Sequence, residues 1–177
     1  MPWWSWRAGQ TDTSLTITSS LDQPPVLTGD DGPPADDQPV LPVTLDRLSA
    51  ALDAVEIRYL TDGRGSLLAL WERHAVLFTL EGPSDEILVM RVRPHATVPP
   101  DWADRSYRVV NEWNHTRRFC KAYVGDPTDR GQLPIYAEMQ VPLAAGAHEP
   151  LLVELVDCAA AVATGFVDWL YDDGGLL

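Results

Sequence analysis

Hydrophobic and polar positions follow two different periods along residues 101–124. Spaced at 100° per residue, apolar and small side chains fall on one helical face, and polar side chains fall on the opposite face. The first set is Trp102, Ser106, Val109, Val110 and Trp113, and the second is Asp104, Arg108, Asn111, Glu112 and His115. From Phe119 onward the period becomes two, as in a strand. With Asp101 as its expected N-cap, the pattern predicts an amphipathic helix leading directly into a strand.

The other apolar segments predict further strands and a first helix, separated by turns rich in Gly, Pro and Asp. Thr44 is expected to cap this helix, which carries Leu45, Leu48, Leu52 and Val55 on one stripe. Strands are expected at 57–60, 67–71, 75–80, 87–92 and 135–141. Because the first four follow one another through short turns, antiparallel pairing is expected. The predicted class is α+β: a mostly antiparallel sheet with helices on one face, in the order α-β-β-β-β-α-β-β-α.

The last predicted helix, 150–171, has an unusually wide apolar face. Its polar and small positions occupy about a third of the circumference. They are Glu154, Asp157, Ala161, Thr164, Gly165, Asp168 and Asp172. Such a helix needs cover on two sides, one from the sheet and the other from the first helix or a second subunit. A homodimer is therefore expected, and the candidate residues for a dimer or partner face are Val153, Ala160, Val167 and Trp169.

Residues 1–43 differ in composition from the rest of the chain. They are rich in Pro and Asp and lack periodic apolar positions, so they are predicted to form a disordered tail. The exception is a tryptophan cluster, Trp3, Trp4 and Trp6, which either docks on the domain or a partner or has no role. Residues 44–177 are expected to form one domain.

The charge narrows the possible partners. The formal net charge is −13, which disfavours binding to DNA, RNA or an anionic membrane. Residues 151–170 are long enough to span a bilayer but contain Glu154, Asp157 and Asp168. The N-terminus has no apolar signal-like stretch, and two cysteines do not make a disulfide framework. We therefore expect a cytoplasmic protein with reduced thiols.

The sequence contains no convincing catalytic, cofactor or metal constellation. His115 and Cys120 are close in the chain, but no third member or oxyanion loop accompanies them. His74, His95 and His148 lack the spacing of metal ligands. The helical carboxylates are interpreted as solvent-facing, and a non-enzymatic protein with no cofactor is expected.

Residues 110–124 resemble the signature segment of the YbjN family, in which an Asn-x-x-Asn helix end runs into an Arg-Phe strand. The similarity in element order extends over about residues 44–171. YbjN-like domains are similar to type III secretion chaperones, which are small α/β folds that often dimerise and hold extended peptides. The resemblance therefore implies a type III secretion chaperone-like fold and candidate partner-binding residues Asn111, Trp113, Asn114 and Arg118. The residues themselves indicate that the two asparagines form hydrogen bonds to backbone groups, and that Asn114 and Thr116 help to end the helix before the strand.

The leading hypothesis is a non-enzymatic regulatory or chaperone-like module that binds a protein or peptide, as expected of a YbjN-like bacterial sensory transduction regulator. The alternative is a small-molecule-sensing or enzymatic domain with a pocket between sheet and helices. An apolar pocket with convergent polar groups would favour the alternative, and a shallow open groove with an exposed strand edge would favour peptide binding.

Overall fold

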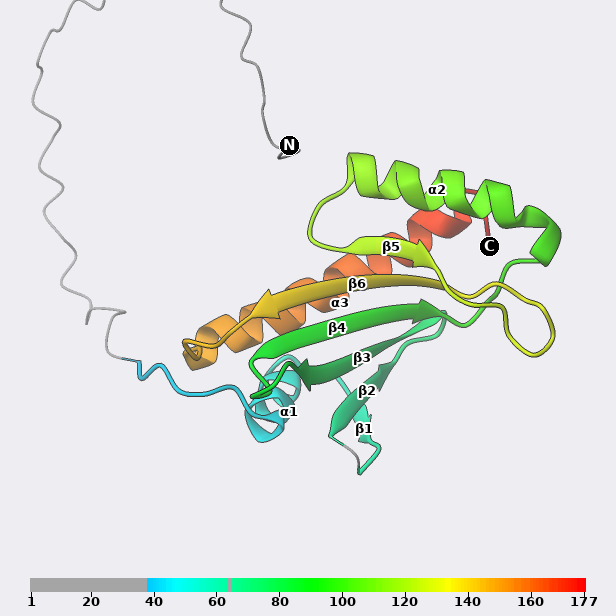
Figure 1. Cartoon of the computed structure of the whole chain (residues 1–177). Coiled ribbons are helices and arrows are strands. Elements are labelled where there is room, and N and C mark those ends of the chain that lie inside the picture. Colours follow the sequence, from blue (N-terminus) through cyan, green and yellow to red (C-terminus); the bar gives the residue numbers. More distant parts are fainter. Residues whose placement is uncertain (1–37, 64) are drawn as a thin grey trace, which may run out of the picture. The chain divides into compact units, whose positions relative to one another are not determined.

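The computed structural model describes residues 38–63 and 65–177 (Figure 1). Most of the predicted tail, with all three of its tryptophans, lies outside the described residues. The elements follow the predicted order. The helices are α1 (Leu45–Ala54), α2 (Ala103–Thr116) and α3 (Glu149–Tyr171), and the strands are β1 (Tyr59–Thr61), β2 (Ser66–Leu70), β3 (His74–Glu81), β4 (Ile87–Pro94), β5 (Lys121–Val124) and β6 (Ile135–Pro142).

One six-stranded sheet has the strand order β1-β2-β3-β4-β6-β5. Every neighbouring pair is antiparallel, so the predicted α+β class and pairing are confirmed. Strands β1 and β5 form its two edges. The sequence did not predict this order, because β6 inserts between β4 and β5 instead of adding outside β5. The long loop between β5 and β6 permits this arrangement.

The predicted start of α2 is wrong by one residue, because Trp102 and not Asp101 is the N-cap. Asp101 lies inside a 3-10 turn (Pro100–Trp102), and α2 begins only at Ala103. The prolines before Asp101 restrict the backbone, and the tighter turn carries the chain into the helix. Of the predicted apolar face, Ser106, Val109, Val110 and Trp113 are buried, and the predicted polar set is exposed. Trp102, also predicted on the apolar face, lies in the 3-10 turn and is 37% exposed.

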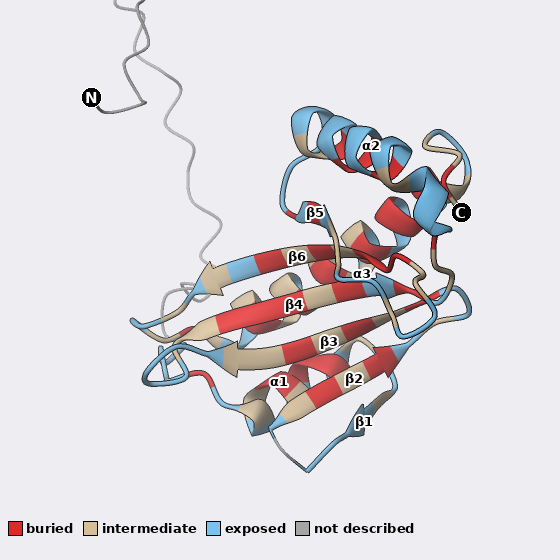
Figure 2. Cartoon of the chain, turned by 45° about the vertical axis from the view of Figure 1, so that its right-hand side comes forward, coloured by how far each residue is buried: buried red, intermediate tan, exposed pale blue. Residues whose placement is uncertain are grey.

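All three helices pack toward the same side of the sheet. In Figures 1 and 2, α1 and α3 lie behind the strands and α2 lies beyond β5. The buried stripe of α3 has the spacing of a helix that faces a sheet. It comprises Leu152, Val156, Ala159, Ala163, Phe166, Val167 and Leu170. The predicted polar stripe of α3 is exposed at every position, as expected from its spacing.

Much of the second side of α3 is covered within the chain. Helix α1 packs beside it, and Trp113 of α2 lies edge-on to Phe166, with ring centroids 4.9 Å apart. Trp113 also lies 5.3 Å from the ring of Trp169. By length and composition α3 could cross a membrane, but a helix in the core of a folded domain has the same length and composition. The buried side chains of α3 belong to the core of this domain.

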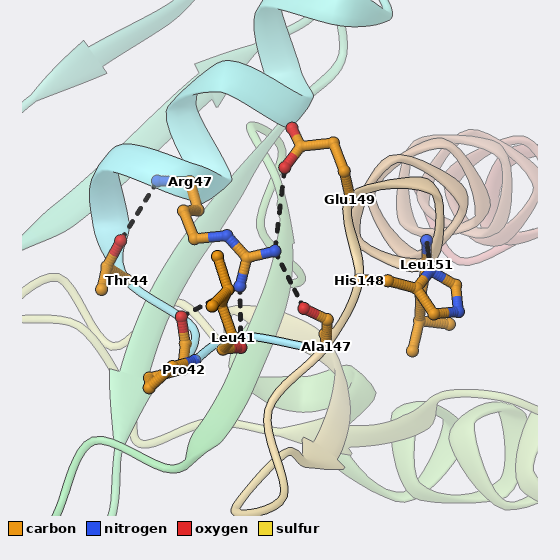
Figure 3. Close-up of polar contacts among 8 residues, drawn as sticks. All are labelled: Leu41, Pro42, Thr44, Arg47, Ala147, His148, Glu149 and Leu151. Carbon is orange, nitrogen blue, oxygen red and sulfur yellow. Dashed lines mark hydrogen bonds and ion pairs between the residues drawn. The ribbon is translucent and has the colours of Figure 1, made fainter. Parts of the chain in front are cut away.

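Arg47 joins the segment before α1 to the start of α3 (Figure 3). Its guanidinium donates hydrogen bonds to the carbonyl oxygens of Leu41, Pro42 and Ala147, at 2.8, 2.9 and 2.9 Å. It also lies 3.7 Å from the carboxylate of Glu149. Leu41 and Ala147 form a β-bridge, and the Val43 side chain is buried. The packed domain therefore includes residues 41–43, which the sequence assigns to the tail.

His74 begins β3 and is buried, although its sequence position suggested a turn. Its ring stacks on Trp71 with centroids 5.0 Å apart, which explains how an imidazole is accommodated there. Its Nε2 atom has no hydrogen-bond partner among the described residues. Burial lowers the pKa of His74, the nearby His95 lowers it further, and Asp168 opposes the shift.

Acidification is expected to destabilise the domain through His74. In the unfolded chain His74 binds a proton at its ordinary pKa, whereas in the folded chain it does so only at lower pH. The unfolded state therefore binds more protons below about pH 6.5, and the free energy of unfolding falls there. Urea denaturation at pH 7 and pH 5 should show a smaller pH-dependent loss in His74→Phe than in the unmodified protein. His115→Ala, an exposed position on α2, is the control. Equal losses in all three proteins would contradict this role of His74.

Candidate functional site

The face of the sheet opposite the helices is open and carries leucine side chains next to arginine side chains. Figure 2 shows no helix in front of the described parts of β2, β3, β4 and β6. The strand register places Leu68, Leu77, Arg91 and Glu138 in one row across these strands. A second row contains Leu70, Ala75 and Arg93. Because side chains alternate along a strand, both rows point to the helix-free face.

These rows line a hollow of about 520 Å³. We call it the sheet hollow and define it by eight residues: Leu68, Leu70, Ala75, Leu77, Arg91, Arg93, His95 and Tyr136. One half, from β2 and β3, is aliphatic, and the other half, from β4 and its following turn, carries the cationic side chains. Leu60 on the edge strand β1 extends the aliphatic half; it is 59% exposed, and Leu70 is 53% exposed. A contiguous exposed apolar patch of this kind on a folded protein often marks an interaction site.

Arg91 is neutralised within the sheet. Its Nε atom donates a hydrogen bond to Glu138 over 2.6 Å, and its guanidinium lies 3.9 Å from Glu81. Burial alone would raise the pKa of Glu138, but hydrogen bonds from Gln140, Arg91 and Tyr123 outweigh it and the pKa is lowered. Burial also opposes the charge of Arg91, and its bond to Glu138 still raises the pKa. The two groups are therefore both ionised and cancel one another.

Arg93 is different. It is exposed, and within the described residues its side chain has neither an ion pair nor a hydrogen bond. His95 lies beside it in the sheet hollow. Its Nε2 atom donates a hydrogen bond of 3.0 Å to the carbonyl oxygen of Trp71, because a carbonyl oxygen can only accept. The sheet hollow thus presents one uncompensated guanidinium next to an aliphatic surface.

The residues predicted from the signature segment do not form one surface. Trp113 is 4% exposed, so it is a core residue and its prediction as a partner-binding residue is wrong. Asn111 and Arg118 are exposed, and their role in partner binding stays a prediction. Asn114 binds the following strand: its Nδ2 donates to the Ala122 carbonyl at 2.9 Å, and its Oδ1 accepts from the Ala122 amide at 2.8 Å. Asn114 thus forms the backbone hydrogen bonds expected of it, and these bonds hold β5 against α2.

Removing the Asn114 amide should weaken the attachment of β5 to α2. Asn114→Ala leaves both polar groups of Ala122 without these partners, which should lower the free energy of unfolding by about 2 kcal/mol. Asn111→Ala, on the exposed face of the same helix, should change it by less than about 0.5 kcal/mol. Chemical denaturation followed by circular dichroism measures both values. If the two variants lose the same amount, Asn114 has no structural role beyond that of an exposed residue.

The predicted partner face on α3 also needs correction. Val167 is 1% exposed and Trp169 is 7% exposed, because the sheet and Trp113 cover them. They are therefore unavailable to a second subunit. Val153 and Ala160 are partly buried and still have accessible surface. The predicted patch is correspondingly smaller than the periodicity of α3 suggested.

Cys120 and His115, which are close in the sequence but were not predicted to form a catalytic pair, lie in different environments. Cys120 is buried, and burial raises the pKa of its thiol, so the nucleophilic thiolate is disfavoured at neutral pH. His115 is exposed in the last turn of α2. Among the residues that the structure describes, no three His, Cys, Asp or Glu side chains cluster as metal ligands.

The sequence reasoning missed the sheet hollow, although a signal was present. Strands β2 and β3 carry apolar side chains on both faces, including both Leu67 and Leu68 and both Val76 and Leu77. Helices on one face alone would leave the second apolar set exposed. In β4, Arg91 and Arg93 alternate with Met90 and Val92, which places both arginines on that same second face.

The profile of the YbjN family, described as "Putative bacterial sensory transduction regulator", matches residues 44–172. The chain therefore belongs to the YbjN family. A solved structure with a similar fold is YbjN from E. coli, described as "a putative transcription regulator". The two share 12% sequence identity with a TM-score of 0.63, and the similarity covers 76% of this chain and 97% of that chain. Among curated proteins, no sequence matches this chain.

Proposed function

We propose that the protein is a non-enzymatic regulatory module that binds an extended segment of a partner protein on the helix-free face of the sheet, as chaperone-like domains do. The observation that carries the proposal is the sheet hollow, where exposed leucines adjoin a guanidinium. The hollow is open and shallow, and the adjacent edge strand β1 leaves one side without a described neighbouring strand. This combination is the one expected of peptide recognition.

The alternative of a ligand pocket between sheet and helices has less support. The layer there contains large side chains with almost no exposed surface, including Phe78, Phe166, Leu88 and Met90. A small molecule would have to displace them, which disrupts a close-packed core. The description of the E. coli relative as a transcription regulator is compatible with an indirect role, because a net charge of −13 opposes contact with DNA phosphates.

Binding on this face can be tested with surface variants that leave the core intact. The tagged full chain and a Leu60→Glu/Leu70→Glu variant would be used to capture proteins from native lysate, followed by mass spectrometry. Both leucines are more than half exposed, so the variant should stay folded. We expect a specific partner to be retained by the unmodified chain and lost by the variant. Tyr107→Glu, at a position 53% exposed on α2, is the matched control and should retain it.

Capture of the same proteins by all three chains would contradict binding at the helix-free face. So would loss of the partner from the α2 control but not from the sheet variant. Circular dichroism of each variant would establish that the helices and sheet are retained.

We also propose that the protein acts in the cytoplasm as a homodimer, using the accessible part of α3 around Val153 and Ala160. Light scattering should then report about twice the chain mass of 19.6 kDa, and Ala160→Arg should give a folded monomer. A single species near the chain mass at high micromolar concentration would contradict dimer formation.

A further inference from the structure

The sheet hollow combines two chemistries in a fixed arrangement. Its aliphatic half is formed by Leu68, Leu70 and Leu77, and its cationic side chain without a described partner is Arg93. The neighbouring Arg91 is neutralised by Glu138, so Arg93 is the group that has a full positive charge available for a ligand. The surrounding chain is strongly acidic, with a formal charge of −13. The hollow therefore favours a ligand with a negative charge next to Arg93.

The distance between the two chemistries follows from the sheet. Leu70 and Ala75 are cross-strand neighbours, and so are Ala75 and Arg93. The leucine and the arginine are thus two strands apart, or about 9–10 Å between backbones. An extended chain advances about 3.3 Å per residue, so a segment crossing the strands covers this distance in about three residues. A side chain as long as arginine also reaches a position one residue nearer.

We infer that the sheet hollow recognises an extended partner segment with an apolar side chain and, two or three residues away, a carboxylate side chain. The apolar side chain packs on the leucines, and the carboxylate pairs with the guanidinium of Arg93. A guanidinium can hold a carboxylate through two parallel hydrogen bonds, which adds directional selectivity to the charge attraction. A lysine in the same place would be repelled. This inference rests on the proposed function and names the chemistry of the partner.

Labelled peptides provide a direct test with the full-length chain. The probes are fluorescein-labelled ten-residue peptides that alternate leucine and threonine around one central glutamate, with glutamine or lysine at that position as counterparts. Fluorescence anisotropy should show that the glutamate peptide binds about tenfold more tightly than the glutamine peptide, with the lysine peptide weakest. The preference should decrease as salt is added, since the pair is exposed.

Charge exchange identifies the residue responsible. Arg93→Glu should reverse the order, so that the lysine peptide binds more tightly than the glutamate peptide. Arg108→Glu makes the same charge change on the exposed face of α2 and should leave the order unchanged. A reversed order in the Arg93 variant alone supports the inference, because general repulsion by an acidic protein would affect both variants equally.

Several results would overturn the inference. These are equal binding of the glutamate and lysine peptides, an unchanged order in Arg93→Glu, or binding of none of the peptides. If a glutamate peptide with serine in place of its leucines binds as tightly as the leucine-containing one, the apolar side chains do not contribute to recognition. Displacement of the peptide by decanoate at comparable concentration would show a site for a small amphipathic carboxylate. If the partner captured through Leu60 and Leu70 persists while the peptide preference is absent, the acidic-segment inference fails and the proposed function stands.

Discussion

Replacing Trp113 with alanine is expected to lower the free energy of unfolding by about 3–5 kcal/mol. The indole is almost fully buried and contacts both Phe166 and Trp169 of α3. Its loss removes the aromatic contacts that join α2 to α3 and leaves a cavity between them. Urea denaturation followed by far-ultraviolet circular dichroism would measure the change without depending on the fluorescence of the deleted tryptophan.

Two companion variants separate packing from other effects. Trp113→Phe keeps an aromatic ring in the cluster, so it should cost much less than alanine. Tyr107→Ala, at an exposed position of the same helix, should change the free energy by less than about 0.5 kcal/mol. If Trp113→Ala were as mild as Tyr107→Ala, the indole would not be part of the core, and a role in partner binding would again be open.

Replacing Arg47 with methionine is expected to cost about 2–3 kcal/mol. Methionine keeps an apolar stem but cannot donate to the three carbonyl oxygens that Arg47 contacts at the junction of residues 41–42 and Ala147 (Figure 3). The side chain is only 17% exposed, so water replaces these bonds incompletely. The same denaturation measurement applies.

The ion pair of Arg47 contributes less than its hydrogen bonds. Glu149 is 52% exposed and its carboxylate lies 3.7 Å away, so Glu149→Gln should change the free energy by less than about 1 kcal/mol. A loss in Arg47→Met no larger than that in Glu149→Gln would show that the segment before α1 is not held by these bonds. The domain would then begin at α1.

Local periodicity predicted the elements well because each amphipathic segment faces one large surface. The buried and exposed positions of α2 and α3 follow directly from the spacing of their side chains. The periodicity of α3 shows how much apolar surface needs cover, but it does not identify which part of the chain or of a second subunit supplies that cover. Trp113, distant in sequence from α3, supplies part of that cover.

The sheet hollow was harder to predict because it depends on register between strands. Leu70 and Arg93 are 23 positions apart in the chain, and two ladders of cross-strand pairs bring them to one face. Arg91 and Arg93 also look equivalent in the sequence. The largest difference is that Glu138 of β6 lies opposite Arg91, and the insertion of β6 next to β4 was not predictable from the local pattern.

Site-specific photocrosslinking tests the central claim most directly. A photoreactive phenylalanine analogue would be placed at Leu70 on the helix-free face or at Ala161 on the exposed stripe of α3, and the full chain irradiated in the cells that produce it. Binding at the sheet predicts a discrete protein adduct from position 70 that is absent from position 161. Protein adducts from position 161 without any from position 70 would contradict the assignment of the helix-free face as the binding surface.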